Sequence, residues 1–110
     1  MTLSTHVLDA TSGLPAAGVP VAVDRRSDRG WEPLGSAVTD DDGRCRSLVP
    51  DGLEIGVYRL TFDTAHHFRT SGRSGFYPEV SIVFEVAEPQ RHHHVPLLLS
   101  PFAYSTYRGS

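Results

Sequence analysis

The sequence has little cysteine, little positive charge and no long apolar run, and each absence excludes a class of protein. Cys45 is the only cysteine among 110 residues, so no disulfide can form within the chain, which fits a reducing compartment. Ten basic residues stand against thirteen acidic ones, and the net charge of −3 argues against nonspecific nucleic-acid binding. No stretch of about 18 apolar residues occurs, so no transmembrane helix and no membrane partner are expected.

The first ten residues, MTLSTHVLDA, also lack the basic and then apolar pattern of a secretory signal. A cytoplasmic location is therefore expected. With 110 residues, of which 39% are hydrophobic, the chain is long enough and apolar enough to form one folded domain, expected to span residues 1–110.

Short alternating runs, separated by turn residues about every ten positions, predict an all-β fold. The sequence DDDG at 40–43 is a strong turn signal, and Pro33 predicts an edge strand or a bulge. Residues 64–72 predict the one helix, with Asp63 or Thr64 as its N-cap and Gly72 at its end. Strands are predicted at 3–9, 19–24, 31–39, 56–64, 79–86, 92–100 and 103–110, a short one at 44–48, a loop at 11–18 and a turn at 25–30. Together these elements predict a two-sheet β-sandwich.

Three consecutive histidines at 92–94 allow three interpretations. Alternation along a strand puts His92 and His94 on one face and His93 on the other. A zinc site needs three or four converging ligands, and nothing in this spacing indicates them. From this stretch alone, a polar strand end in solvent, a catalytic element and a metal site all remain open.

Three other positions carry weaker signals. His6 shares a strand face with Ser4, opposite the face expected to enter the core. Arg44 follows a turn and is either a solvated surface charge or a fixed cation for an anionic or carbonyl-bearing ligand. His66 and His67 do not share a helix face and are both predicted to lie at the surface. These local patterns do not identify a function.

A resemblance goes further. The segments LSTHVLDATSGLPAAGVPV, WEPLGSAVTDDDGRC, YRLTFDT, FYPEVSIVFEV and HHHVPLLLSPFAYSTYRGS, in this order, resemble the 5-hydroxyisourate hydrolases of the transthyretin-related family over nearly the whole chain. The most specific part is VPLLLSP followed by a terminal YSTYRGS, which marks the hydrolases. The hormone carrier transthyretin lacks that last tetrapeptide, and it also lacks the histidines and the arginine at the corresponding places.

The resemblance implies a transthyretin-like sandwich of two four-stranded antiparallel sheets with one short helix, assembled as a homotetramer with a central channel. It also implies an enzyme of urate degradation that opens the six-membered ring of 5-hydroxyisourate to 2-oxo-4-hydroxy-4-carboxy-5-ureidoimidazoline. No cofactor and no metal are expected, because acid–base help and charge stabilisation suffice for water attack on an acyl–nitrogen bond. The small-molecule substrate is the expected partner, and a transthyretin-like ligand carrier is the alternative.

The resemblance also implies roles for individual residues. It places catalysis on His6, Arg44 and His94, and substrate contacts on Tyr107, Arg108, Gly109 and Ser110. His93 stands in the middle of the family's usual His-Tyr-His run and is expected to point away from the site. Alternation cannot aim all four tail residues at one site, so they are expected either to leave the strand or to serve a neighbouring subunit.

Overall fold

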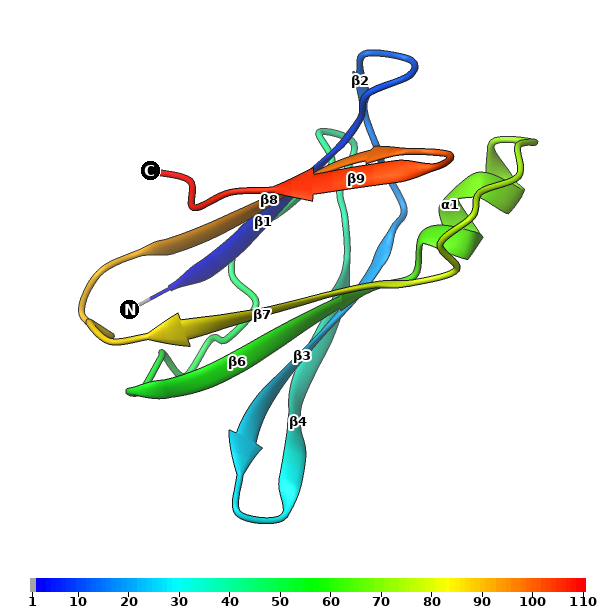
Figure 1. Cartoon of the computed structure of the whole chain (residues 1–110). Helices are drawn as coiled ribbons and strands as arrows, with labels where there is room; N and C mark the ends of the chain where they lie inside the picture. The colour runs from blue at the N-terminus through cyan, green and yellow to red at the C-terminus, as the bar shows by residue number, and fades with distance from the viewer. Residues whose placement is uncertain (1) are drawn as a thin grey trace.

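Two β-sheets pack face to face in the computed structural model, which describes residues 2–110 (Figure 1). Sheet A contains β1 (Leu3–Asp9), β2 (Leu14–Pro15), β5 (Arg44–Cys45), β8 (His93–Ser100) and β9 (Ala103–Thr106). Sheet B contains β3 (Pro20–Ser27), β4 (Gly30–Val38), β6 (Gly56–Phe62) and β7 (Val80–Val86). The helix α1 (Thr64–Thr70) lies at one end of the sandwich, and the start of β1 and the C-terminus lie toward the other end (Figure 1).

The predicted all-β sandwich with one short helix is confirmed, with two differences in sheet A. Sheet B is antiparallel in the order β4-β3-β6-β7, but sheet A is mixed because β1 runs parallel to β8. Sheet A also has five strands, since the two-residue strands β2 and β5 both pair with β1. Strand β1 thus has a long partner on one side and two short ones on the other.

Strict alternation along β1 determines which of its residues enter the core. Leu3, Thr5 and Val7 are fully buried, while His6 stays partly exposed on the outer face of sheet A. This confirms the predicted face of His6. The core between the sheets is closed mainly by valine, leucine and phenylalanine side chains, which pack well on pleated surfaces.

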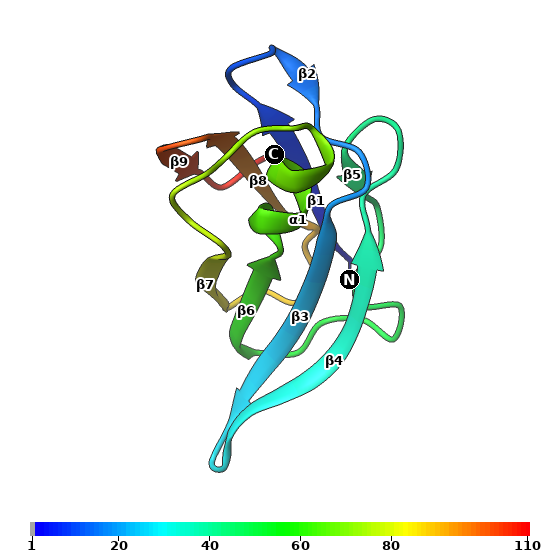
Figure 2. The same ribbon diagram turned by 90° about the vertical axis from the view of Figure 1, so that its right-hand side faces the viewer.

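Several element boundaries differ from the sequence prediction, most clearly at the end of β3. Strand β3 continues to Ser27 instead of ending at residue 24, because it pairs with β4 through a two-residue turn, with Ser27 opposite Gly30. This β3–β4 hairpin extends beyond the body of the sandwich (Figure 2). The edge position predicted from Pro33 is confirmed, and the β3–β4 register shifts opposite it, between Val23 and Asp24.

The predicted helix is confirmed with its cap. The Asp63 carboxylate accepts a hydrogen bond of 3.0 Å from the His66 amide, and Phe68 anchors the helix in the core. Within residues 2–110, no helix is both long and apolar enough to cross a membrane.

Candidate active site

A pocket of about 290 Å³ opens on the outer face of sheet A, near the start of β1. Directly paired residues on neighbouring strands project to the same face of a sheet, so the strand register assembles this pocket. Ser4 is paired with His94, and His6 is paired with Arg44. Side chains from β1, β5, β8 and the C-terminal tail line the pocket, among them Ser4, Arg44, His92, His94 and Ser110.

The DDDG turn delivers Arg44 to this pocket. Asp40 Oδ1 accepts hydrogen bonds from the amides of Asp42, at 2.9 Å, and Arg44, at 3.0 Å, and the bond from Arg44 lowers the pKa of Asp40. Gly43 has a φ of 74°, and a Cβ there would overlap the Val7 carbonyl oxygen. Glycine therefore lets the turn approach β1 closely, where the Val7 amide donates to the Gly43 carbonyl at 2.7 Å.

His94 is half-buried and has the electrostatic setting of a neutral base. Its Nδ1 lies 2.7 Å from Ser4 Oγ. Desolvation by burial, together with the charges of Arg44, His92 and His6, lowers the pKa of His94 below its ordinary value of 6.5. The ring is therefore neutral at pH 7, and with Nδ1 bonded to Ser4, Nε2 is the nitrogen available to take a proton.

His6 lies on the same face but is not among the residues that line the 290 Å³ pocket. Its Nε2 donates a hydrogen bond of 2.8 Å to the carbonyl oxygen of Asp42. A carbonyl can only accept, so the neutral His6 ring carries its proton on Nε2 and keeps Nδ1 as an acceptor. The structure thus brings Arg44, His94 and Ser110 together, with His6 beside them.

The C-terminal tail is fastened directly to His94. The Gly109 amide donates to the His94 carbonyl at 2.8 Å, forming an isolated antiparallel bridge. A Cβ on Gly109 would overlap the His94 ring, so only glycine fits here without displacing that side chain. Strand β9 ends at Thr106, so the tail leaves the strand, as one of the two sequence alternatives expected, and Ser110 reaches the pocket.

Tyr107 and Arg108 do not reach the same pocket within one chain. Both are exposed and line a second pocket of about 260 Å³, together with His93 and residues of β7. His94 lines both pockets and therefore lies between them. The tail divides accordingly, with Ser110 on the Arg44 side and Tyr107 with Arg108 on the β7 side.

The histidine run is only partly what alternation predicts. His93 does project away from the Arg44 pocket, but it is 6% exposed, and its Nδ1 donates to the Arg91 carbonyl at 2.9 Å. A polar strand end in solvent is therefore wrong for His93. His92 has no role assigned by the resemblance; it bonds through Nε2 to Ser4 Oγ at 2.9 Å and through Nδ1 to Thr2 Oγ1.

Ser4 is the residue that sequence reasoning missed. Its hydroxyl lies between the rings of His92 and His94, which stack at a centroid separation of 6.3 Å with an interplanar angle of 19°. A sequence signal for this role did exist, because strand alternation places Ser4 on the face of His6 and places His92 on the face of His94. We call Ser4, His92 and His94 the Ser4 network. Across residues 2–110, no group of three His, Cys, Asp or Glu side chains is arranged to hold a metal ion.

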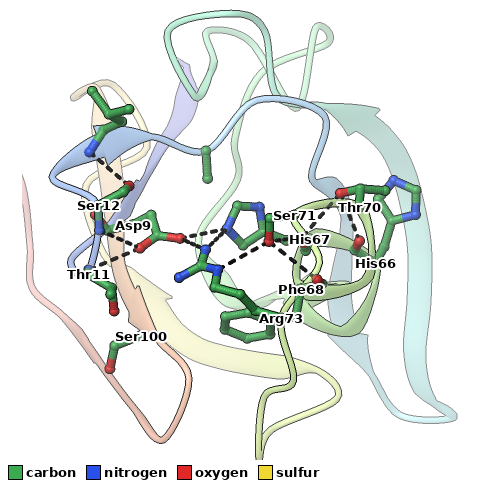
Figure 3. Close-up of polar contacts among 12 residues, drawn as sticks. Asp9, Thr11, Ser12, His66, His67, Phe68, Thr70, Ser71, Arg73 and Ser100 are labelled. Carbon is green, nitrogen blue, oxygen red and sulfur yellow. Dashed lines mark hydrogen bonds and ion pairs between the residues drawn. The ribbon is translucent and has the colours of Figure 1, made fainter.

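A second network shows that His67 is not a surface residue, contrary to the sequence prediction. His67 is 11% exposed, and its Nε2 lies 2.9 Å from Asp9 Oδ2 (Figure 3). Arg73 Nη2 donates to the same oxygen, while Asp9 Oδ1 accepts from the amides of Thr11, at 3.0 Å, and Ser12, at 3.1 Å. Helix periodicity missed this contact because Asp9 comes from a distant strand. We call Asp9, His67 and Arg73 the Asp9 network.

Burial alone would raise the pKa of Asp9, whose side chain is 3% exposed. The hydrogen bonds from Arg73, His67 and the two amides outweigh this effect and hold the pKa of Asp9 far below its usual range. Asp9 is thus a carboxylate that is charged at neutral pH, and its hydrogen bonds tie α1 and the following loop to β1.

A larger surface groove, of about 580 Å³, lies over sheet B near Pro20, Ala37 and Glu79. Its lining contains neither histidine nor arginine, so it offers no neutral base and no fixed cation. The smaller pocket on sheet A therefore has the better chemistry for a hydrolytic site.

Comparison with known proteins gives a consistent result. The model of the HIUase/Transthyretin family matches residues 3–109. A 5-hydroxyisourate hydrolase from Caulobacter vibrioides is 47% identical over 112 residues, covering 98% of this chain and 97% of that protein. The structure of Klebsiella pneumoniae 5-hydroxyisourate hydrolase matches with a TM-score of 0.89 and 38% identity, covering 100% of both chains. Sea bream transthyretin in complex with thyroxine matches with a TM-score of 0.92 and 34% identity, covering 99% of this chain and 95% of that one. The backbone alone therefore does not separate the hydrolases from the carriers.

Proposed function

The chain belongs to the HIUase/Transthyretin family, and on that premise we propose that it hydrolyses 5-hydroxyisourate to 2-oxo-4-hydroxy-4-carboxy-5-ureidoimidazoline in urate degradation. The observation that carries this proposal is the pairing, in one pocket, of a neutral half-buried imidazole with a guanidinium, His94 with Arg44. A carrier needs neither a base nor a cation at this place.

His94 acts as the general base. Its Nε2 accepts a proton from water as the water oxygen adds to a ring carbonyl of the substrate. Arg44 stabilises the negative charge that develops on the carbonyl oxygen. When the acyl–nitrogen bond breaks, the leaving nitrogen takes a proton from Nε2 of His94, or from Nδ1 of His6 when that ring has first been protonated.

Water attacks directly in this mechanism, without a covalent intermediate. Cys45 lines the pocket, but it is buried, and desolvation raises the pKa of its thiol, which opposes formation of a nucleophilic thiolate. The Ser4 hydroxyl is bonded to two imidazoles and does not act as the nucleophile in this mechanism.

The tail completes the site. Gly109 keeps the tail against His94, and Ser110 contacts the substrate beside Arg44. Tyr107 and Arg108, which line the neighbouring pocket, bind substrate either within the chain or across a subunit boundary.

We further propose a homotetramer built as a pair of two-fold related dimers. Exposed rings gather where the α1–β7 connection meets the β8–β9 turn: Phe76 is 69% exposed, Phe102 is 76% exposed and Tyr104 is 42% exposed. Tyr77 links them through edge contacts with Phe76 and Tyr104, at 5.0 and 5.2 Å between ring centroids. Such a patch is typical of an interface. Sedimentation at micromolar concentration should give a tetramer, and a stable monomer would contradict the proposal.

The same proposal takes residues 1–110 as one hydrolase domain that works in the cytoplasm. The free, buried thiol of Cys45 is compatible with a reducing compartment. Fractionation of the native cells, followed by detection of the protein in each fraction, checks the location.

The decisive experiment is an absorbance assay with 5-hydroxyisourate prepared freshly by oxidation of urate. The spontaneous decay, measured without protein, is subtracted. We expect the protein to accelerate loss of the substrate signal in proportion to its concentration. A decay rate that does not change with protein concentration would reject the function.

A further inference from the structure

We propose that the Ser4 hydroxyl joins His94 and His92 into a two-imidazole base, in which the proton taken from water is shared between the two rings. This inference rests on the proposed hydrolytic function. It concerns two residues, Ser4 and His92, to which the resemblance assigns no role.

The distances require one of the two imidazole nitrogens to donate a hydrogen bond to Ser4 and the other to accept one from it. Ser4 Oγ lies 2.7 Å from His94 Nδ1 and 2.9 Å from His92 Nε2. A hydroxyl has one proton, so it donates to one nitrogen and accepts from the other. Ser4 is only 8% exposed, so water competes little for these hydrogen bonds.

If His94 acts as a base, only one donor-to-acceptor direction is possible along the series of hydrogen bonds that joins His94, Ser4 and His92, which we call the hydrogen-bond chain. For Nε2 of His94 to hold a free lone pair, its ring proton must lie on Nδ1 and be donated to Ser4. Ser4 then donates to His92 Nε2, and the neutral His92 ring donates from Nδ1 to Thr2 Oγ1, with which it is in hydrogen-bonding contact. The hydrogen-bond chain thereby fixes His94 in the tautomer whose Nε2 can accept a proton from water.

After His94 has taken the proton from water, the hydrogen-bond chain can also move the resulting positive charge away from His94. His94 then carries a positive charge close to Arg44, and this charge is opposed both by burial and by the guanidinium. The Nδ1 proton of His94 moves to Ser4 Oγ while the Ser4 hydroxyl proton moves to His92 Nε2. One N–H bond and one O–H bond break, and one of each forms, so the net result is transfer of the charge to His92.

His92 is the better place to hold the charge, because it is exposed to solvent whereas His94 is half-buried. The same steps in reverse return the proton to His94, which then donates it from Nε2 to the leaving nitrogen. His92 therefore acts through His94 and Ser4 as a proton store, and it never contacts the reacting atoms.

Kinetics of matched variants test this inference. Ser4→Ala and His92→Phe, the latter retaining a ring to stack on His94, should each lower kcat about 10-fold with little change in KM. Ser4→Thr keeps the hydroxyl and should restore most of the rate. His66→Phe, on α1 at the other end of the sandwich, is the matched histidine control and should behave as wild type.

A second readout does not depend on turnover. Nitrogen-15 NMR of the ring nitrogens, at a pH where both rings are neutral, should show the proton of His94 on Nδ1 in the wild type and in Ser4→Thr. In Ser4→Ala this fixed tautomer should be lost while the fold, judged from the backbone amide spectrum, is retained.

The outcomes separate the two proposals. If the wild type does not hydrolyse 5-hydroxyisourate, the proposed function fails, while the tautomer measurement still tests the hydrogen-bond chain. Equal loss of rate in Ser4→Thr and Ser4→Ala would show that shape alone matters and would overturn the inference. Wild-type rates in His92→Phe, or a His94 proton found on Nε2 in the free protein, would also overturn it.

Discussion

Strand β1 carries a histidine network at each of its ends, and the two networks have opposite characters. The Ser4 network, a hydroxyl between two imidazoles, lies on the outer face of sheet A beside a solvent-accessible pocket. The Asp9 network lies about 17 Å along the strand, on the inner face, where a buried carboxylate is saturated with donors (Figure 3). The same residue type, histidine, thus takes part in proton exchange at one end and in a fixed hydrogen bond to a carboxylate at the other.

The two networks differ because histidine is hydrogen-bonded to a hydroxyl in the Ser4 network and to a carboxylate in the Asp9 network. A serine hydroxyl both donates and accepts, so it lets a neighbouring imidazole change its proton. A carboxylate with a strongly lowered pKa only accepts and stays charged, so it holds its partners in one arrangement. We therefore expect damage at the Asp9 end to affect stability and damage at the Ser4 end to affect turnover.

The largest effect is expected from Asp9→Asn, which should lower the free energy of unfolding by about 3 kcal/mol, the scale for removing one partner of a buried ion pair. The variant leaves Arg73 and His67 without their shared charge. Denaturant unfolding at pH 7 measures the change, with Asp28→Asn, at an exposed turn, as the control. Turnover by the folded fraction should stay close to wild type. A variant as stable as the wild type would show that this network is dispensable.

The Asp9 contribution also has a defined pH dependence. Because the pKa of Asp9 is lowered by folding, its stabilisation is fully present above the ordinary carboxyl value of 3.8. It is lost as the pH falls from there toward the folded-state pKa. The difference in stability between wild type and Asp9→Asn should therefore narrow only in this acidic window. A difference that already disappears between pH 7 and pH 5 would contradict this assignment.

The next effect concerns the catalytic end. His94→Ala, Arg44→Ala and His6→Ala should each lower turnover by roughly 10²-fold or more, the scale of acid–base and oxyanion groups. The free energy of unfolding should change little, since all three side chains are partly exposed. The absorbance assay and denaturant unfolding are measured on the same samples. A large loss of stability in His94→Ala would remove the contrast with the Asp9 end.

His93 sharpens this contrast between neighbours. His93→Ala should retain turnover, because the ring projects away from the Arg44 pocket, but it should lower stability by about 1–2 kcal/mol as a buried bonded ring is removed. The same two assays decide the outcome. If His93→Ala loses as much turnover as His94→Ala, the assignment of faces in β8 is wrong.

A smaller effect is expected from the tail. Gly109→Ala should lower turnover about 10-fold, since the added methyl group would overlap the His94 ring and displace it from its position in the site. A tag fused after Ser110 should be more harmful than the same tag before Met1. Full activity in the C-terminally tagged protein would contradict a role for the tail in the site.

The smallest effect is a shift in titration. The pKa of His94, followed by NMR, should lie below 6.5 in the wild type and should rise in Arg44→Ala, because a nearby positive charge is removed. The acidic limb of kcat/KM should therefore lie below pH 6.5 in the wild type. A His94 titration unchanged by Arg44→Ala would show that Arg44 does not contribute to the lowered pKa.

Much of this architecture could be predicted from the sequence, because it depends on local alternation. The face of His6, the edge position of β4 and the Asp63 cap all follow from period and from turn or capping chemistry. The Asp9 network could not be predicted, since it joins residues 58 and 64 positions apart whose contact depends on how the sheets pack. Burial of His93 escaped for the same reason.

The candidate site was predicted mainly through resemblance, and its assignments stay predictions until the variants are measured. What alternation could not give is the distribution of the tail. Gly109 and Ser110 turn toward His94 and the Arg44 pocket only because β9 ends at Thr106, a boundary with no sequence signal of its own.

The parallel pairing of β1 with β8 has a consequence for how the protein is made. The contact between Ser4 and His94 joins positions 90 residues apart, and parallel pairing of this kind forms late because a long loop must close first. A nascent chain therefore holds β1 with one long edge unpaired until the residues of β8, His93–Ser100, have left the ribosome. Recovery of hydrolysis during refolding should accordingly report the last step of folding rather than the collapse of sheet B.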